Sequence, residues 1–422
     1  MKFVRKILAG IVGTLMTWSL VSHADRLPPW IEPGDVPLPA NARSVVAIHN
    51  EVPLLARPNA GAPRRGVLAT DFPMPVFAVK RGPGCVNRWL NVGPLAWVCR
   101  DKVNFSQSPP IPAGELVYNE TPDGLPYRYF FVGRGGSWGH SRLRSVEVST
   151  PDQTFEQGFA VAIIEQRENQ GEMYGRTTHD VWVPMRDLHP VRATTFQGEQ
   201  IRDGNLDVAW VFTNNAVARS KPSTYGRPRQ KLVRFQLLKV LEEKTVGRHN
   251  YYRIGDHAWV SDHVVRKPSK APPPKEVKQG DRWIDIHLQS QTLVAYVGDQ
   301  PVYATLVSTG KGRQGTAFAT PKGVHRIWVK LVASSMDNLE DEYASDVYSI
   351  EDVPYVQFFS RGVGLHATFW HKKFGRVRSH GCVNLPPLDA QWLFRFTSPH
   401  LPAGWRAVLP SDLEAATIIR VR

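Results

Sequence analysis

One spacing pattern recurs three times before the last third of the chain: an aromatic residue, seven further residues, then a tryptophan followed by valine. The aromatic pairs that frame the three copies are Trp89 and Trp97, Tyr174 and Trp182, and Tyr251 and Trp259. An aliphatic residue stands six positions beyond each tryptophan, and the first and third copies carry turn-forming residues between the framing aromatics. The pattern predicts strand, polar turn and strand in each copy, with the tryptophans packed inside a small β-structure.

These repeats resemble bacterial SH3-like domains, which are small β-barrels common in secreted cell-wall proteins. The first and third copies match better, whereas the middle copy is diverged and carries an insertion. We therefore predict an SH3-like domain at residues 40–108, a diverged one at 115–192 and a third at 203–266. The alternative is that the short pattern arises from unrelated hairpins. The resemblance implies that these domains bind an anionic cell-wall polymer.

The first 24 residues are typical of a cleavable export signal. Basic residues lead into an apolar run at residues 7–21, which is shorter than the roughly 20 residues that cross a bilayer. Small residues flank His23, as a signal peptidase requires, and the alternative is an uncleaved membrane anchor. We predict that residues 1–24 are a signal peptide and that the mature chain is a periplasmic protein without a stable membrane anchor.

The net charge of the chain limits the classes of molecule that it is expected to bind. The 422 residues include 52 Lys and Arg against 38 Asp and Glu, a formal net charge of +14. Such a protein is attracted to polyanions, which include nucleic acid, anionic lipid and acidic wall polymers. Because the predicted signal sends the protein out of the cytoplasm, we exclude nucleic acid as its physiological partner.

Beyond the repeats, residues 267–280 are rich in Pro and Lys with almost nothing apolar, which predicts an extended linker rather than a packed segment. Residues 281–411 read as strands of alternating polarity, with one helix predicted at about 387–397. Within them, residues 332–350 are acidic and weakly patterned, which indicates an inserted loop and a candidate lid. Residues 412–422 are predicted to be a C-terminal tail.

The chain has three cysteines, and two of them, Cys85 and Cys99, are near neighbours in sequence. In an oxidising compartment we predict that these two form a disulfide that staples the first SH3-like domain; the alternative is two buried thiols. Pairing leaves Cys382 alone. An unpaired cysteine in an exported protein is expected to be either buried or used in chemistry, and its neighbours decide which.

Cys382 lies in the hexapeptide Ser-His-Gly-Cys-Val-Asn at residues 379–384, and His366 precedes it by sixteen residues. Acyl transfer by cysteine needs a thiolate, a base that generates it, and backbone N–H groups for the oxyanion. A histidine lowers the pKa of a thiol by stabilising the thiolate as an ion pair. Gly381 permits the tight turn that aims successive N–H groups at one point. These residue types predict a cysteine–histidine pair for acyl transfer.

The same stretch resembles the signature of the L,D-transpeptidases: a histidine, a loop of about a dozen residues, then Ser-His-Gly-Cys-Val-Asn. Further landmarks of that family follow in order, with Val-Ser-Thr-Gly at 307–310, Thr-Pro-Lys-Gly at 320–323 and Val-Pro-Tyr at 353–355. The resemblance covers residues 281–411 and implies a β-sandwich with one or two short helices. The predicted fold class of the whole chain is therefore mainly β, with SH3-like barrels followed by this sandwich.

The resemblance implies a role for each matched residue. Cys382 is the nucleophile, and His366 is the base that takes its proton while the carbonyl of Ala367 orients the His366 ring. The N–H groups of Cys382 and Gly381, with His380, hold the tetrahedral oxyanion. The residues implied to shape and line the substrate groove are Ser379, Arg378 and Asn384, with Tyr355 and Trp370 on its wall.

Two further histidines need an interpretation. For His380 the alternative to oxyanion binding is structural support. His371 is closer to Cys382 in sequence, but the family carries its base at the position of His366, so His371 is predicted to be exposed to solvent.

The implied reaction is attack by Cys382 on the carbonyl of the third residue of a peptidoglycan stem peptide, with loss of D-alanine. A side-chain amine of a neighbouring stem then opens the thioester to give a 3→3 crosslink. Two alternatives keep Cys382: opening by water, which makes an L,D-carboxypeptidase, and transfer to a lysine of an anchored protein. An alternative of another class is a non-catalytic wall-binding protein. No cofactor is expected, and no Cys/His cluster has the spacing of a zinc site.

Overall fold

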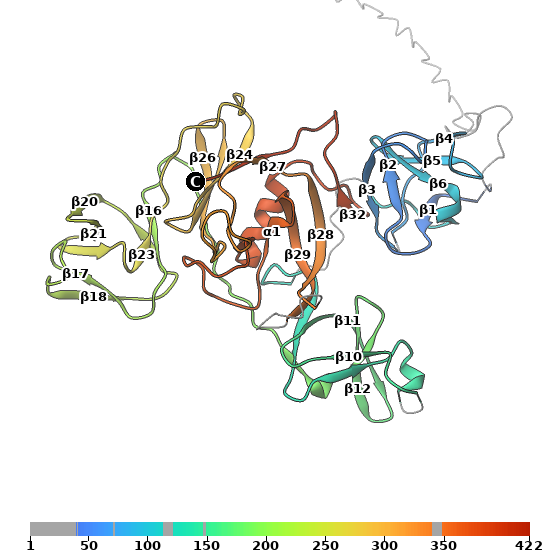
Figure 1. Ribbon diagram of the computed structural model, residues 1–422, viewed down its shortest axis with the longest axis horizontal. Helices are drawn as coiled ribbons and strands as arrows, with labels where there is room; N and C mark the ends of the chain where they lie inside the picture. Colours follow the sequence, from blue (N-terminus) through green and yellow to red (C-terminus); the bar gives the residue numbers. More distant parts are fainter. Residues whose placement is uncertain (1–38, 40, 71, 113–120, 147–148, 340–347) are drawn as a thin grey trace, which may run out of the picture.

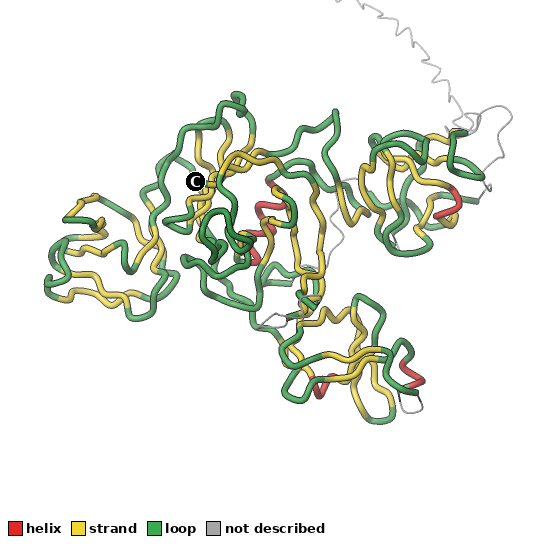
Figure 2. Tube along the Cα trace, in the orientation of Figure 1, coloured by secondary structure: helices red, strands yellow, loops and turns green. Residues whose placement is uncertain are grey.

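The computed structural model describes residues 39, 41–70, 72–112, 121–146, 149–339 and 348–422. The predicted signal peptide at residues 1–24 lies outside these ranges. Within them, the structure is mainly β with a single α-helix, as predicted, and the other segments drawn red in Figure 2 are short 3-10 helices. None of the helices in these ranges has the length and apolar character needed to cross a bilayer.

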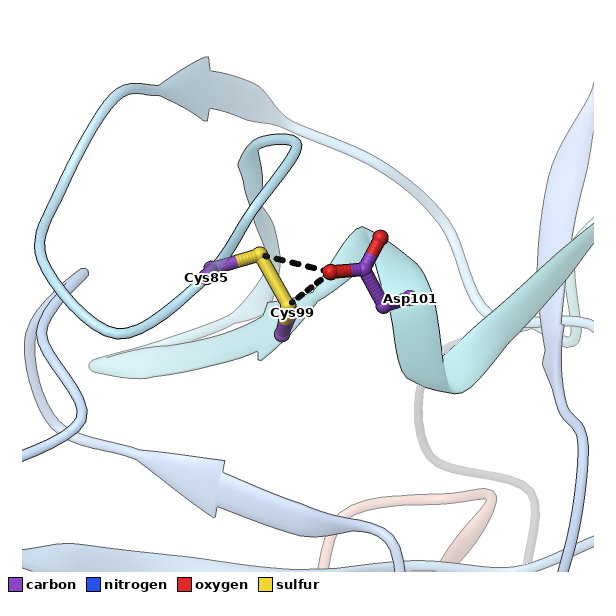
Figure 3. A group of neighbouring side chains, drawn as sticks. All are labelled: Cys85, Cys99 and Asp101. Carbon is purple, nitrogen blue, oxygen red and sulfur yellow. Dashed lines mark hydrogen bonds between the residues drawn. A yellow bond between two sulfur atoms is a disulfide. The ribbon is translucent and has the colours of Figure 1, made fainter.

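The first module, residues 40–108, is built from seven short strands, at the right of Figure 1. They are β1 (Ser44–Ala47), β2 (Pro53–Leu55), β3 (Arg64–Leu68), β4 (Ala78–Lys80), β5 (Trp89–Gly93), β6 (Ala96–Cys99) and β7 (Val103–Ser106). The predicted disulfide is present: Cys85 and Cys99 are joined, with their Cα atoms 5.6 Å apart (Figure 3). The bond ties the loop before β5 to the end of β6.

The second module, residues 115–192, also consists of short strands. They are β8 (Arg128–Val132), β9 (Ser137–Gly139), β10 (Gln153–Phe155), β11 (Ala160–Asn169), β12 (Glu172–Thr177), β13 (Trp182–Pro184) and β14 (Leu188–Pro190). Its interior contains Phe130, Phe155 and Val183.

The third module, residues 203–266, completes the series. Its strands are β16 (Val208–Val211), β17 (Ala216–Arg219), β18 (Pro228–Leu232), β19 (Leu237–Lys239), β20 (Glu242–Val246), β21 (His249–Gly255), β22 (Ala258–Ser261) and β23 (Val265–Arg266). The SH3-like character of the three modules remains a prediction.

Trp89 is buried, at 3% exposed, in agreement with the prediction that the repeat tryptophans pack each interior, whereas this prediction is wrong for Trp97 and Trp259. Trp97 and Trp259 are only partly buried, whereas the valine after each of them, Val98 and Val260, is almost fully buried. Successive side chains on a strand point to opposite faces, so burial of the valine turns its tryptophan outward. In the middle copy Trp182 is buried, at 7% exposed.

The last domain is a sandwich of two sheets around one helix. One sheet has the order β15 (Glu199–Gln200), β26 (Gln300–Leu306), β25 (Thr292–Val297), β24 (Arg282–His287), β33 (Ile418–Val421) and β27 (Gly323–Arg326). The facing layer contains β28 (Val329–Asp337), β29 (Ser349–Ser360), β30 (Val363–Ala367) and β31 (Val383–Leu385). Helix α1 (Pro387–Phe396) packs Ala390, Leu393 and Phe394 into the core between them.

Two predicted segments differ in the structure. Residues 412–422 are not a tail, because they end in β33, which pairs with β24 and β27 in the middle of a sheet. The Pro/Lys-rich linker at 267–280 forms no strand or helix, yet Ala271 is buried and its N–H donates to the Tyr296 hydroxyl at 3.1 Å. Ala271 and the partly buried Val277 both pack in a hydrophobic cluster with residues of the last domain, such as Trp283, and this holds part of the segment against the domain.

The first and second modules are joined to the last domain by strand pairing rather than by linkers alone. Strand β3 of the first module pairs with β32 (Trp405–Val408), and Trp405, at 1% exposed, packs in the core of that module. Gly66 permits this contact, because a Cβ there would lie 2.6 Å from the Trp405 ring. Strand β11 of the second module meets β29 at Ala160 and Ile350.

Candidate active site

Two parallel strands bring the predicted catalytic pair together. In β30 and β31, Leu365 pairs with Val383 and His366 pairs with Asn384. Leu365 and Val383 point into the domain core, so the alternation of side chains sends His366 and Asn384 to the opposite face. Cys382 immediately precedes β31, two residues before Asn384, and therefore shares that face. The sequence thus places the thiol beside the imidazole through one strand register.

A cleft of about 750 Å³ opens over this face. It contains most of the predicted site residues: His366, Trp370, Arg378, Ser379, His380, Cys382 and Asn384. The rest of its lining comes from Lys311, His371, the β29–β30 turn and both arms of the β28–β29 hairpin.

His366 is held in one tautomer. Its side chain is buried, and Nδ1 lies 2.9 Å from the carbonyl oxygen of Ala367. Because a carbonyl only accepts, Nδ1 carries the proton and Nε2 keeps its lone pair. The ring lies nearly parallel to that of Trp370, with centroids 5.7 Å apart. Burial lowers the pKa of His366 to about 4, so the ring is neutral at pH 7 and able to accept a proton.

Cys382 is a protonated thiol at neutral pH. Burial raises its pKa, and the N–H of Gly364 opposes this shift only in part. The pKa shifts of Cys382 and His366 both disfavour the thiolate–imidazolium ion pair. The ion pair is disfavoured because burial keeps His366 neutral and so removes the positive charge that would have lowered the pKa of the thiol. The arrangement instead fits general-base removal of the thiol proton at the moment of attack.

The turn before the nucleophile is fixed by hydrogen bonds. Gly381 has a φ of 130°, a region that favours glycine, and its carbonyl accepts from Thr320 Oγ1 at 2.6 Å. Ser379 Oγ donates to the carbonyl of Cys382 and accepts from the N–H of Gly381 at 3.1 Å. The Gly381 amide predicted for the oxyanion is thus engaged by Ser379. Ser379 acts here as a positioning residue.

His371 was predicted to be exposed to solvent, and this prediction is wrong. It is partly buried in the cleft, and its Nε2 lies 2.9 Å from Nδ2 of Asn384. Burial, followed by the positive charge of Arg378, lowers its pKa to about 3. The loop that carries His371 folds back over β31, which sequence distance alone did not reveal.

Tyr355 is not on the groove wall. It packs in the domain core against Phe394, with ring centroids 5.7 Å apart, and its hydroxyl accepts from Gln391 Nε2 at 3.2 Å. The wall is formed instead by Tyr348 and Ile350, which lie earlier on the same arm of the hairpin.

The sequence missed these hairpin residues because the stretch 332–350 lacks a clear strand pattern. Its two ends belong to β28 and β29, and the cleft is lined by Ser334, Ser335, Met336 and Asp337 from the first arm. The tip of the predicted lid, residues 340–347, lies outside the described residues.

Among the described residues, two groups bring three potential metal ligands together, and neither lines the active-site cleft. In one, Asp101 Oδ2 lies 3.3 Å from Cys99 Sγ (Figure 3), but the disulfide removes both thiolates. The other is His249, Asp262 and His263 in the third module.

Part of the chain matches a known protein family. Residues 281–404 match the family model of the L,D-transpeptidase catalytic domain (YkuD). No curated protein sequence matches the chain.

Several solved structures resemble parts of the chain. An L,D-transpeptidase of Enterococcus faecium is 22% identical over 34% of this chain and 50% of its own, with a TM-score of 0.25. One of Stackebrandtia nassauensis is 25% identical over 35% of this chain and 58% of its own, with a TM-score of 0.24. One of Mycobacterium smegmatis is 14% identical over 62% of this chain and 99% of its own, with a TM-score of 0.26. The chain thus spans half the length of the Enterococcus faecium protein.

Proposed function

We propose that this chain, whose residues 281–404 match the L,D-transpeptidase catalytic domain, is a cysteine-dependent L,D-transpeptidase of peptidoglycan stem peptides. The observation that carries the proposal is the neutral His366, whose Nδ1 proton is tied to Ala367 while its ring shares a cleft with the Cys382 thiol. A base with a free lone pair next to a thiol is the minimum that acyl transfer needs.

The first half-reaction makes a thioester. His366 Nε2 takes the thiol proton as Cys382 Sγ attacks the carbonyl of the third stem residue, a diamino acid. The N–H groups of Cys382 and His380 stabilise the oxyanion, because Gly381 is engaged by Ser379. The C–N bond to the terminal D-alanine then breaks, and His366 returns the proton to the leaving amine.

The second half-reaction decides the product. A side-chain amine of a neighbouring stem gives up a proton to His366 and attacks the thioester, which regenerates the thiol and leaves a 3→3 crosslink. Arg378, Asn384 and Trp370 line the same cleft and position the stems. Water in place of the amine gives an L,D-carboxypeptidase, and a protein lysine gives protein attachment to the wall.

We further propose that the chain is exported through residues 1–24, works in the periplasm and is held near an anionic wall polymer by its SH3-like modules. Its net charge of +14 supports attraction to such a polymer.

The test is incubation of the mature protein with disaccharide-tetrapeptide, followed by mass spectrometry, with Cys382→Ala as the control. We expect loss of D-alanine and a crosslinked dimer, both dependent on Cys382. Tripeptide without dimer moves the assignment to carboxypeptidase. If wild type and variant both leave the substrate untouched, acyl transfer is refuted and the non-catalytic wall-binding alternative takes its place.

A further inference from the structure

A second cleft, of about 910 Å³, lies between the third module and the last domain. Its module side is formed by residues around β20–β23, and its other side by residues 287–290 and by Arg376. Arg376 belongs to the loop between His366 and Cys382, so the cleft lies against the back of the catalytic loop.

The cleft has more positive than negative side chains. Five cationic residues line it: Arg248, Arg266, Lys267, Lys270 and Arg376. Its two carboxylates belong to Glu243 and Asp262. Glu243 is paired with Lys267 at 2.7 Å, and Asp262 Oδ2 accepts the N–H of Asn250 at 3.0 Å.

Three of the cations lack an acidic partner. Among the described residues, no carboxylate lies within ion-pair distance of Arg248, Lys270 or Arg376. Their charges therefore remain available to a ligand.

Two of the guanidinium groups are held close together in spite of their like charges. Arg266 and Arg376 both lie over the ring of Phe212, at 3.8 and 5.2 Å from its centroid. Burial lowers the pKa of Arg266, Asp262 opposes this, and Arg376 lowers it further. The same Arg376 lowers the pKa of Arg234, whose pKa burial already lowers. A cluster of guanidinium groups that repel one another is typical of a site that binds an anion.

The cleft is physically tied to the catalytic loop. Arg266 Nε donates to the carbonyl of Gly375 at 3.0 Å, and Gly375 has no room for a side chain because a Cβ would lie 2.7 Å from Phe212. Further along the same loop, Arg378 lines the active-site cleft. The 371–379 loop therefore contributes to both clefts.

We propose that this cleft binds the free carboxylates of peptidoglycan stem peptides and holds a wall strand next to the active site. The inference deepens the proposed function and rests on it for the identity of the polymer. Arg and Lys recognise carboxylates by charge-assisted hydrogen bonds, and the stems that feed the active site end in a carboxylate. A strand seated here presents further stems to the active-site cleft at high effective concentration.

The test measures binding, not turnover, so that it stays valid if the acyl-transfer proposal fails. All proteins are full-length and carry Cys382→Ala. The cleft variant combines Arg248→Gln, Lys270→Gln and Arg376→Gln. The matched control removes the same charge from exposed positions of the same module outside the cleft, through Arg229→Gln, Lys231→Gln and Lys239→Gln. Thermal melting checks that both remain folded.

Each protein is sedimented with purified sacculi, with sacculi whose carboxylates have been converted to amides, and with soluble inorganic polyphosphate as competitor. We expect the cleft variant to bind native sacculi about tenfold or more weakly than the control, and amidation to weaken the parent protein equally. Equal binding by cleft variant and control overturns the proposal. Undiminished binding to amidated sacculi also overturns it, and displacement by polyphosphate under those conditions identifies a phosphate polymer as the ligand.

Discussion

The active-site cleft and the cleft beside the third module, to both of which the 371–379 loop contributes, differ in their titratable groups. In the active-site cleft, burial lowers the pKa of His366 and His371 and raises that of Cys382, so all three side chains are neutral at pH 7. In the cleft beside the third module, the cationic residues Arg248, Lys270 and Arg376 lack acidic partners among the described residues. Neutral groups exchange protons readily, whereas exposed charges attract a polymer from a distance. The difference indicates that the active-site cleft carries out the reaction, whereas the cleft beside the third module binds the polymer.

Removal of the nucleophile is expected to have the largest effect. It should abolish the reaction at the active-site cleft without changing binding at the cleft beside the third module. Cys382→Ala should reduce turnover of disaccharide-tetrapeptide on the order of 10⁶-fold, as loss of the nucleophile does in other acyl-transfer enzymes. Binding to sacculi should stay at the wild-type level. Mass spectrometry of the acyl-enzyme and sedimentation measure the two quantities; a residual acyl-enzyme on the variant would assign the nucleophile elsewhere.

Removal of the base comes next. His366→Gln keeps a side chain of similar size without a basic nitrogen, and we expect kcat/KM to fall roughly 10²- to 10⁴-fold. His371→Gln, which changes the other histidine of the same cleft, serves as the matched control and should cost much less. A larger loss in the His371 variant would reverse the assignment of the base.

The pH dependence should distinguish a neutral pair from an ion pair. With a His366 pKa of about 4, kcat/KM should stay level from neutral pH down to about pH 5 and then fall about tenfold per unit below pH 4. The same shift acts on stability: the folded pKa lies below the ordinary 6.5, so the contribution of the neutral ring is present above about pH 6.5 and is lost as the pH falls towards 4. An acid limb near pH 6.5 in stopped-flow acylation would contradict the buried neutral imidazole.

Loss of the turn-fixing hydroxyl should have a moderate effect. Ser379→Ala removes one hydrogen bond to the carbonyl of Cys382 and one to the Gly381 amide, each worth about 1 kcal/mol. We expect kcat to fall about tenfold with little change in KM, because the oxyanion site loses its alignment. Ser334→Ala, in the exposed wall of the same cleft, is the control and should leave kcat within about twofold of wild type.

The smallest effect concerns the link between the clefts. Arg266→Gln removes the hydrogen bond to Gly375 that ties the third module to the catalytic loop. We expect kcat on the soluble substrate to fall about threefold, since a loop shift of a fraction of an ångström disturbs alignment. Arg253→Gln, which breaks a surface ion pair with Glu242 in the same module, is the control. Identical kinetics for both variants would show that the hydrogen bond between Arg266 and Gly375 does not couple the third module to the active site.

The parts of the site that were predictable from the sequence are those fixed by short-range geometry. Cys382 and Gly381 lie in one hexapeptide, and the Ala367 carbonyl that contacts His366 belongs to the adjacent residue. The family landmarks placed the domain at residues 281–411, close to the matched range of 281–404. Local sequence determines such contacts because few other conformations connect neighbouring residues.

The parts that failed depend on tertiary packing. The sequence predicted Tyr355 on the groove wall and His371 at the solvent-exposed surface. In the structure Tyr355 packs in the domain core, and His371 lines the active-site cleft. Strand β33 was missed because its partners lie far earlier in the chain, β24 by 135 residues (Trp283 to Ile418) and β27 by 92 (Arg326 to Ile418), and its short apolar run carried no turn signal. Burial at these positions is decided by distant partners, which one sequence does not reveal.

Trp405 has a consequence for the order in which the molecule is assembled. This residue stands at the end of the last domain, yet its ring is part of the interior of the first module, beside Leu54 and Leu90. The segment synthesised first therefore completes its interior only when nearly the whole chain has been made. The first module thus depends on residues 405–408 for part of its core and for a partner of strand β3.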